Sequence, residues 1–184
     1  MLSYIRHMSI RKKLLLGISG VLAVGLLLLG GFWLAHLMQP NNNPVPASIT
    51  PQVSFIPLVI PANIKSITTS DYKVSTVEDG THILTYIMHL ANADVTVSEY
   101  PQPSQFTDVP DFKSKFLDDV IQQTASLSTS SGTIVLGQMA KQQNKQFAVM
   151  LEHGLVVFMT PSESIGQDQW QAIGDTLDTI KPSY

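Results

Sequence analysis

Apolar residues follow two patterns along the chain, one long uninterrupted run near the start and many short alternating segments after it. The run extends from Leu14 to Met38 and contains no Asp, Glu, Lys or Arg. As a helix with a rise of about 1.5 Å per residue, residues 14–35 span roughly 33 Å, against a hydrocarbon core of about 30 Å. The pattern therefore predicts a membrane-spanning helix over residues 14–38.

The segment after the run, residues 39–51, is rich in Pro and Asn and has no repeating apolar period. Such a composition is typical of a semi-extended linker. Residues 52–184 are numerous enough to form one domain with its own hydrophobic core. Its first segment, Gln52–Pro61, is apolar but contains Pro57, which predicts an edge strand or an extended stretch.

Alternating apolar and polar residues predict an antiparallel meander in the first half of this domain. The segments Tyr72–Glu78 and Thr81–Leu90 flank Asp79-Gly80, a pair typical of a type I′ hairpin turn. A second turn at Asn92-Ala93 leads into Val95–Tyr100. The expected core face consists of Leu84, Tyr86, Met88, Leu90, Val95 and Val97. Lys73 and Ser75 fall on the same face, so the first strand is expected to be bulged or at the edge.

The second half predicts a helix, three strands and a second helix. Helical spacing of apolar residues indicates a helix over residues 110–126, followed by a strand at Thr133–Met139. Two further strands, Gln146–Glu152 and Leu155–Thr160, are expected to pair around a His153-Gly154 turn.

The closing segment predicts a helix after Pro161. Ser164 and Gln167 have the spacing of a capping box. One face of this helix carries Trp170, Ile173, Leu177 and Ile180. The order of elements indicates an α+β domain with a mainly antiparallel sheet and two helices on one side of it.

Four basic residues precede the apolar run, whereas all 14 acidic residues follow it. These four are Arg6, Arg11, Lys12 and Lys13, and the positive-inside rule places residues 1–13 in the cytoplasm and the domain outside the membrane. Trp33 suits the outer interface. A cleaved signal peptide is the alternative, but the run is longer than the apolar part of such peptides and no small-residue cleavage site follows it. We therefore expect an uncleaved, single-pass anchor whose partner is the lipid bilayer.

Charge and cysteine content exclude several functions. After the run, seven basic residues stand against 14 acidic ones, a formal charge of −7, and none of the seven is Arg. Nucleic acids need clustered positive charge, so no nucleic-acid partner is expected. Because the chain has no Cys, disulfides, thiolate metal sites and a cysteine nucleophile are excluded. The absence of cysteine and of glycosylation signals after the run favours a bacterial envelope.

Residues with catalytic potential occur without a catalytic motif. His82 and His89 are an odd number of positions apart on one predicted strand and face opposite ways, and His153 falls in a turn. The acidic pairs, such as Asp118-Asp119, are typical of solvated surfaces. There is no Gly-x-Ser-x-Gly elbow, Ser-x-x-Lys motif or glycine-rich phosphate loop. We expect no cofactor, no metal and no enzymatic activity, and an envelope hydrolase is the least favoured class.

The two strands around His153 are apolar on both faces, and Met88, Met139, Met150 and Met159 add adaptable side chains. An uncovered second face would form a surface for a hydrophobic ligand or a partner, made of Phe147, Val149, Val157 and Met159. The alternative is that one face lies under a helix and the other under the N-terminal Phe55–Ile60 segment.

The order of FIPLVIP, HILTYIMH, VTVSEYP, KQFAVMLEHGLVVFMT and WQAIGDTLDTI resembles uncharacterised bacterial membrane-anchored ectodomains. That group is distantly similar to lipoprotein-carrier and sporulation-associated extracytoplasmic domains. The resemblance covers roughly residues 53–180 and implies an α+β ectodomain. It implies no catalytic residue.

We expect the chain to display a non-catalytic binding or interaction domain outside a bacterial membrane, with an envelope protein or other envelope component as partner. A binder of a hydrophobic ligand such as a lipid is the alternative. The sequence leaves the ligand and the oligomeric state open.

Overall fold

The computed structural model describes residues 42–180, without the side chains of residues 142–144. The predicted span over 14–38, the basic segment over 1–13, Trp33 and the start of the predicted linker lie outside this part of the chain. Within residues 42–180, no helix has the length and apolar character needed to cross a bilayer.

The domain starts earlier than the expected boundary at residue 52. The chain separates into two units between Pro40 and Asn41. Val45 is buried in the main core, and the carbonyl of Asn42 accepts a hydrogen bond from the backbone N–H of Ala62 at 2.9 Å. The described part of the expected linker therefore packs onto the domain.

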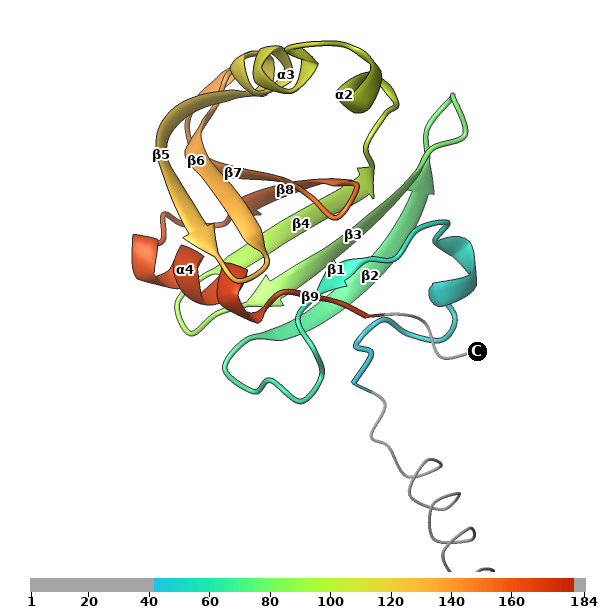
Figure 1. The fold of residues 1–184 in the computed structure, drawn as a ribbon. Coiled ribbons are helices and arrows are strands. Elements are labelled where there is room, and N and C mark those ends of the chain that lie inside the picture. Colours follow the sequence, from blue (N-terminus) through green and yellow to red (C-terminus); the bar gives the residue numbers. More distant parts are fainter. Residues whose placement is uncertain (1–41, 181–184) are drawn as a thin grey trace, which may run out of the picture. The chain divides into compact units, whose positions relative to one another are not determined.

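A seven-stranded sheet, antiparallel throughout, forms the centre of the domain (Figure 1). Its strands lie in the order β2-β3-β4-β8-β7-β6-β5. They are β2 (Thr68–Thr76), β3 (His82–His89), β4 (Asp94–Pro101), β5 (Ile121–Thr129), β6 (Gly132–Met139), β7 (Gln142–Glu152) and β8 (Leu155–Pro161). The predicted mainly antiparallel α+β architecture is confirmed.

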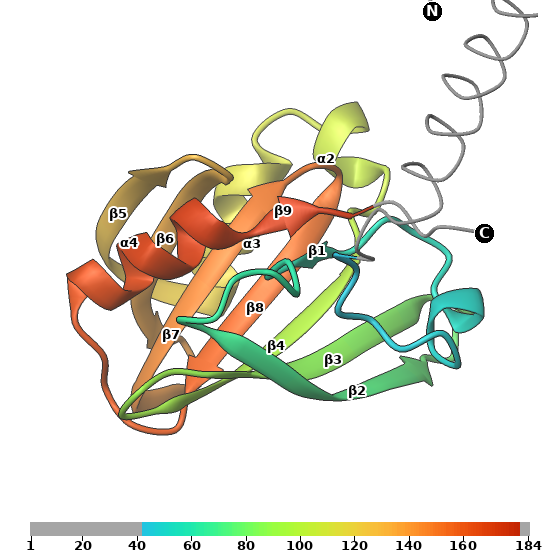
Figure 2. The ribbon, with the colours of Figure 1, turned by 90° about the horizontal axis from the view of Figure 1, so that it is seen from below.

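The shorter elements lie on the two faces of this sheet. The first face, which carries Leu84 and Met150, packs against α4 (Gln167–Thr176) and against a small sheet of β1 (Leu58–Val59) and β9 (Asp178–Thr179). Figure 2 shows α4 and β9 running across the strands on this side. The second face packs against α2 (Gln105–Asp108) and α3 (Phe112–Val120). A short 3-10 helix, η2 (Thr50–Gln52), precedes β1.

Helices therefore cover both faces, whereas the sequence predicted them on one side. The connection from β4 to β5 carries α2 and α3 over the second face, where Phe106, Phe116 and Leu117 join the smaller apolar cluster. Trp170 and Ile173 of α4 are fully buried in the main cluster on the first face.

The predicted core of the first meander is confirmed, because Leu84, Tyr86, Met88, Val95 and Val97 are all fully buried. The turn before it differs from the prediction. Residues 77–81 form a longer turn in which Gly80 has a positive φ and Asp79 does not, so it is not type I′.

The longer turn changes which side of β2 faces the core. Val74 pairs with Leu84 and packs against the core, while Lys73 and Ser75 are exposed. A shift of one residue moves every side chain to the other face. The predicted irregularity in β2 is present as a bulge between Ser70 and Lys73.

The first predicted helix ends earlier than residue 126. α3 stops at Val120, and Ile121 begins β5, which pairs with β6 over its whole length. The strand alternation of Ala125 and Leu127, which both pack on the core, replaces the helical spacing there. Pairing with β6 therefore overrides the local helical pattern.

The last helix begins at Gln167, three residues after the predicted cap at Ser164. Gly166 is its N-cap, and its backbone N–H donates to Gln169 Oε1 at 3.2 Å. The helix ends at Thr176, so Leu177 lies just beyond it and the chain continues into β9.

Candidate functional site

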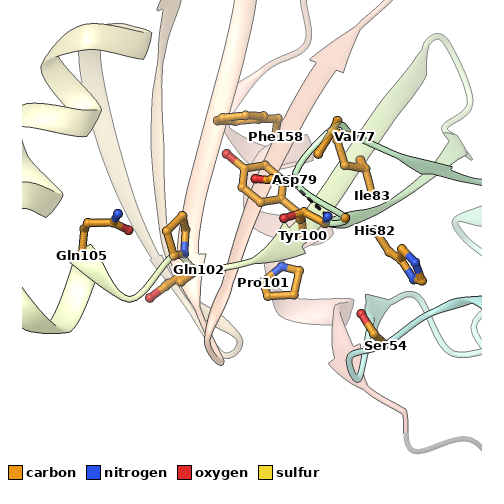
Figure 3. Close-up of a pocket in the computed structure, with 13 residues that line it drawn as sticks. Ser54, Val77, Asp79, His82, Ile83, Tyr100, Pro101, Gln102, Gln105 and Phe158 are labelled. Carbon is orange, nitrogen blue, oxygen red and sulfur yellow. Dashed lines mark hydrogen bonds between the residues drawn. The ribbon is translucent and has the colours of Figure 1, made fainter.

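Two cavities share one lining side chain, that of Phe158, which lies on the second face of the sheet. The larger one, here called the hairpin cavity, has a volume of about 800 Å³ and lies beside the β2–β3 turn. Its lining combines that turn with the end of β4 and the start of α2: Ser54, Val77, Asp79, Gly80, Thr81, His82, Ile83, Tyr100, Pro101, Gln102, Pro103, Gln105 and Phe158. Figure 3 shows Phe158 and Tyr100 between Gln105 on one side and His82 and Ser54 on the other.

The smaller one, here called the helix cavity, has a volume of about 370 Å³. It lies between the end of α3 and the sheet and is lined by Ser98, Asp119, Val120, Met139, Lys141, Phe147, Phe158 and Thr160. Because Phe158 lines both cavities, we name the two together the Phe158 groove. Its floor is apolar, and charged side chains occur in its lining.

Aromatic contacts hold Phe158 in place. Its ring lies 5.9 Å from Tyr100, 6.2 Å from Phe116 and 5.4 Å from Phe147 between centroids. Phe106 of α2 contacts Phe116 of α3 at 5.1 Å, so the short helices and the sheet share one aromatic cluster. Offset and edge-on ring contacts of this kind add stability beyond area burial.

The four residues predicted to form one apolar surface do not lie together. In the β7–β8 pairing, Ala148 is opposite Met159 and Val149 is opposite Phe158. Phe147 and Val149 therefore belong to the second face, while Val157 and Met159 belong to the first. All four are buried, and of the four, Phe147 alone lines either of the two cavities described above. The prediction of a single exposed surface from these residues is corrected.

A glutamate lies buried on the first face. Glu99 of β4 is 0% exposed, and its Oε2 accepts a hydrogen bond from the backbone N–H of Leu58 at 2.8 Å. Oε1 has no hydrogen-bond partner among the described residues. Burial raises the pKa of Glu99 to about 8, against the lowering effects of the Leu58 N–H and the Tyr86 hydroxyl. The carboxyl group is therefore mostly protonated at neutral pH.

A Ser-His-Asp arrangement lies at the other end of the β2–β3–β4 meander. Ser70 Oγ is 2.7 Å from His89 Nε2, and His89 Nδ1 is 2.8 Å from Asp94 Oδ1. This is the order of contacts in a serine hydrolase triad. However, the His89 and Asp94 side chains are 38% and 56% exposed, and neither residue lines either of the two cavities.

A second carboxylate lies beside the hydroxyl group of this arrangement. Ser70 Oγ is also 3.1 Å from Asp71 Oδ2, so this carboxylate competes with His89 for the serine proton. A negative charge at this place opposes the oxyanion that acyl transfer would create. The arrangement therefore fits an exposed polar network at the end of a strand better than a nucleophile.

Two further buried polar groups belong neither to the hydrogen bonds of Glu99 nor to the Ser70–His89–Asp94 arrangement. His82 Nδ1 and Trp170 Nε1 are buried without a hydrogen-bond partner among the described residues. Within residues 42–180, no group of three or more His, Asp or Glu side chains is placed to hold a metal ion.

The sequence analysis predicted neither the buried Glu99 nor the contact between Ser70 and His89, although the sequence carried a signal for Glu99. Glu99 continues the alternation of Val95 and Val97, so strand periodicity places it on the core face. The contact between Ser70 and His89 depends on the bulge in β2 and had no comparable signal.

No protein-family model, curated protein or solved structure matches this chain. The predicted resemblance to bacterial membrane-anchored ectodomains therefore stays a prediction.

Proposed function

We propose that this chain is a single-pass protein of a bacterial membrane whose extracytoplasmic domain binds an envelope protein in the Phe158 groove, without catalysis. The observation that carries the proposal is that two cavities share one aromatic lining side chain, Phe158, whose ring contacts those of its neighbours. Binding sites in proteins are typically concave and mostly apolar, with a few polar groups that orient the ligand.

The groove offers both kinds of contact. Tyr100 and Phe158 supply aromatic surface, and the exposed Gln105 supplies an amide at the rim. Aromatic anchors surrounded by polar groups are typical of protein interfaces. The predicted anchor over residues 14–38 supports the location, because it would present the domain at the membrane surface.

A second candidate is the binding of a lipid or another amphiphile in the helix cavity. The observation in its favour is the apolar floor made by Val120, Met139, Phe147 and Phe158. In this candidate Phe147 still contacts the hydrophobic ligand, as the sequence predicted. Val149, Val157 and Met159, which were predicted to share that surface, take no part.

Site-specific photocrosslinking in intact cells tests the protein-binding proposal. A photoreactive amino acid in place of Gln105 at the groove is compared with the same substitution at Ser126, which is exposed on β5. We expect a discrete protein adduct from position 105 only, and its loss in the Phe158→Leu background. Equal adducts from both positions, or none from position 105, would contradict the proposal.

Native mass spectrometry separates the second candidate from the first. The full chain, extracted from membranes in mild detergent, is weighed before and after solvent extraction. A lipid-sized adduct that disappears on extraction and in Phe147→Ala supports the amphiphile. A mass without adduct, together with the crosslink from position 105, supports the protein partner.

A further inference from the structure

The segment from residue 42 to residue 60, here called the strap, has only a short strand pairing at its β1 end, although the side chains there are buried in the core. β1 has only two residues, and it pairs with the two residues of β9. On its other side, two buried side chains of the large sheet bind the backbone of Leu58. Glu99 Oε2 accepts from its N–H, and the Tyr86 hydroxyl donates to its carbonyl, each at 2.8 Å.

We propose that Glu99 is a proton-dependent latch: its protonated carboxyl group holds the strap against the sheet, and its ionisation releases the strap. The inference concerns the first face of the sheet and does not depend on the Phe158 groove.

The surroundings of Glu99 favour a neutral carboxyl group over a carboxylate. Oε1 is buried without a partner among the described residues, so the Leu58 N–H and the Tyr86 hydroxyl compensate the charge of an ionised group only in part. Burying a charge without hydrogen bonds is far more costly than burying a neutral polar group. Opening of the element that contacts the carboxyl group would admit water and relieve that cost.

Glu99 is distinguished from the titratable groups around it. On β3 and β2, Tyr86 and Tyr72 stack on each other at 5.1 Å. Burial raises the pKa of Tyr72 to about 12 and holds that of Tyr86 well above its usual value, so both stay neutral when Glu99 titrates. His82 lies toward the start of β3 on the same face, and Asp178 of β9 is exposed beside β1.

The residues of β8 and β1 beside Glu99 carry no charge. β8 places Val157 opposite Glu99 in the strand pairing, and β1 contributes Leu58 and Val59. All three are fully buried aliphatic side chains. Release of the strap would expose Leu58, Val59 and Ile60, which are now in the main core.

Hydrogen exchange of the full chain in detergent tests the latch. Exchange is measured at about pH 6.5 and about pH 9.5, with each rate corrected for the intrinsic pH dependence of exchange. We expect protection of the peptide over residues 57–61 to fall about tenfold or more in the wild type, and by less than about twofold in Glu99→Gln. The peptide over residues 147–151 should keep its protection in both.

Tyr86→Phe provides a second variant that keeps the titrating group. Without the hydroxyl bond to Leu58, the strap should be less protected at both pH values, and its protection should still fall from the lower pH to the higher one. Equal protection of residues 57–61 in the wild type at the two pH values would overturn the latch. Parallel loss at residues 147–151 would also overturn it, because the whole domain would then be opening.

Discussion

At the residue scale, the buried carboxyl group of Glu99 is the least expected feature of the domain. Carboxylates are almost never fully buried unless they are paired, and within residues 42–180 no cation forms an ion pair with this one. The alternation of β4 placed Glu99 on the core face, but only the structure shows the backbone of Leu58 beside it. Local periodicity predicts the face of a strand, whereas a partner 41 residues away depends on the tertiary fold.

The raised pKa of Glu99 predicts how stability depends on pH. The folded state keeps the Glu99 proton up to about pH 8, whereas the unfolded chain releases it near the ordinary value of 4.5. Between these values the folded state binds more protons, so stability is greatest at the acidic end and falls as the pH rises toward 8.

Thermal unfolding of the full chain between about pH 5 and about pH 8 measures this effect. We expect the wild-type midpoint to fall across the window, and the midpoint of Glu99→Gln to change less because its amide does not titrate. Glu163→Gln, at an exposed site, should behave as the wild type. Identical slopes in all three proteins would contradict the assignment.

The Ser70–His89–Asp94 arrangement leads to an expected negative result. Asp71 beside the hydroxyl group disfavours nucleophilic attack, so a fluorophosphonate probe should label the wild type no more than Ser70→Ala. Asp71→Asn removes the opposing charge and should not reduce labelling. Labelling of the wild type that disappears in both Ser70→Ala and His89→Ala would contradict the non-catalytic function.

At the element scale, the turn at His153-Gly154 was predicted correctly, but its consequence was not. Both residues have positive φ values, 54° and 73°, as a type I′ turn requires. A two-residue turn pairs Glu152 with Leu155, so odd-numbered positions before it share a face with even-numbered positions after it. This pairing places Phe147 on the same face of the sheet as Phe158 and on the opposite face from Met159.

Element boundaries were less accessible to sequence reasoning. Apolar residues at helical spacing extend through Ile121, yet this residue is the first of β5. Pairing with β6 decides that boundary, and β6 lies beyond the local sequence window. The packing of the described part of the predicted linker has a similar cause, because Val45 is buried against elements distant in the chain.

The packing of α4 on β5 leads to a prediction for Gly174. A Cβ atom at this position would overlap Thr129 Cγ2 and lie 2.7 Å from Thr129 Cβ. Although Ala is intrinsically favoured over Gly in helices by about 1 kcal/mol, overpacking of this kind typically costs about 1–3 kcal/mol. We expect Gly174→Ala to lower the free energy of unfolding in urea.

Gly166 is the matched control, since a Cβ at this N-cap position meets no atom within 4 Å. Gly166→Ala should change stability by less than about 1 kcal/mol. If Gly174→Ala were as stable as the wild type, α4 would not approach β5 as closely as the structure shows.

At the scale of the whole molecule, the sequence predicted one mainly antiparallel domain, and the structure confirms it. Topology beyond that was not accessible, since the neighbouring strands β4 and β8 are separated in the chain by five other elements, α2, α3, β5, β6 and β7. The connection from β4 to β5 passes over β8, β7 and β6, which lie between these two strands in the sheet. This connection carries α2 and α3 and places them on the second face. The Phe158 groove lies beneath it, which is why neither cavity had a sequence signal.

The predicted anchor gives a prediction for the full chain in membranes. Because the basic residues before the apolar run are expected to set the orientation, the chain should resist carbonate extraction and expose its domain to external protease. Replacement of Arg6, Arg11, Lys12 and Lys13 by Asn should protect a larger fraction of the domain. Lys113→Asn with Lys115→Asn, on exposed positions of α3, is the control and should change nothing.

The outcome also distinguishes the anchor from a cleaved signal peptide. An intact chain in the membrane fraction supports the anchor, whereas a shortened chain released by carbonate supports cleavage.

The strand order carries a consequence for how the chain acquires its structure. In the large sheet, β4 with β8 is the one pairing that joins strands not consecutive in sequence. The segments up to β4 and from β5 onward can therefore each form hairpins locally, with loop closure between them as the slow event. A chain cut between α2 and α3, at residues 109–111, should reassemble from its two fragments, and the rate of reassembly should depend on their concentration.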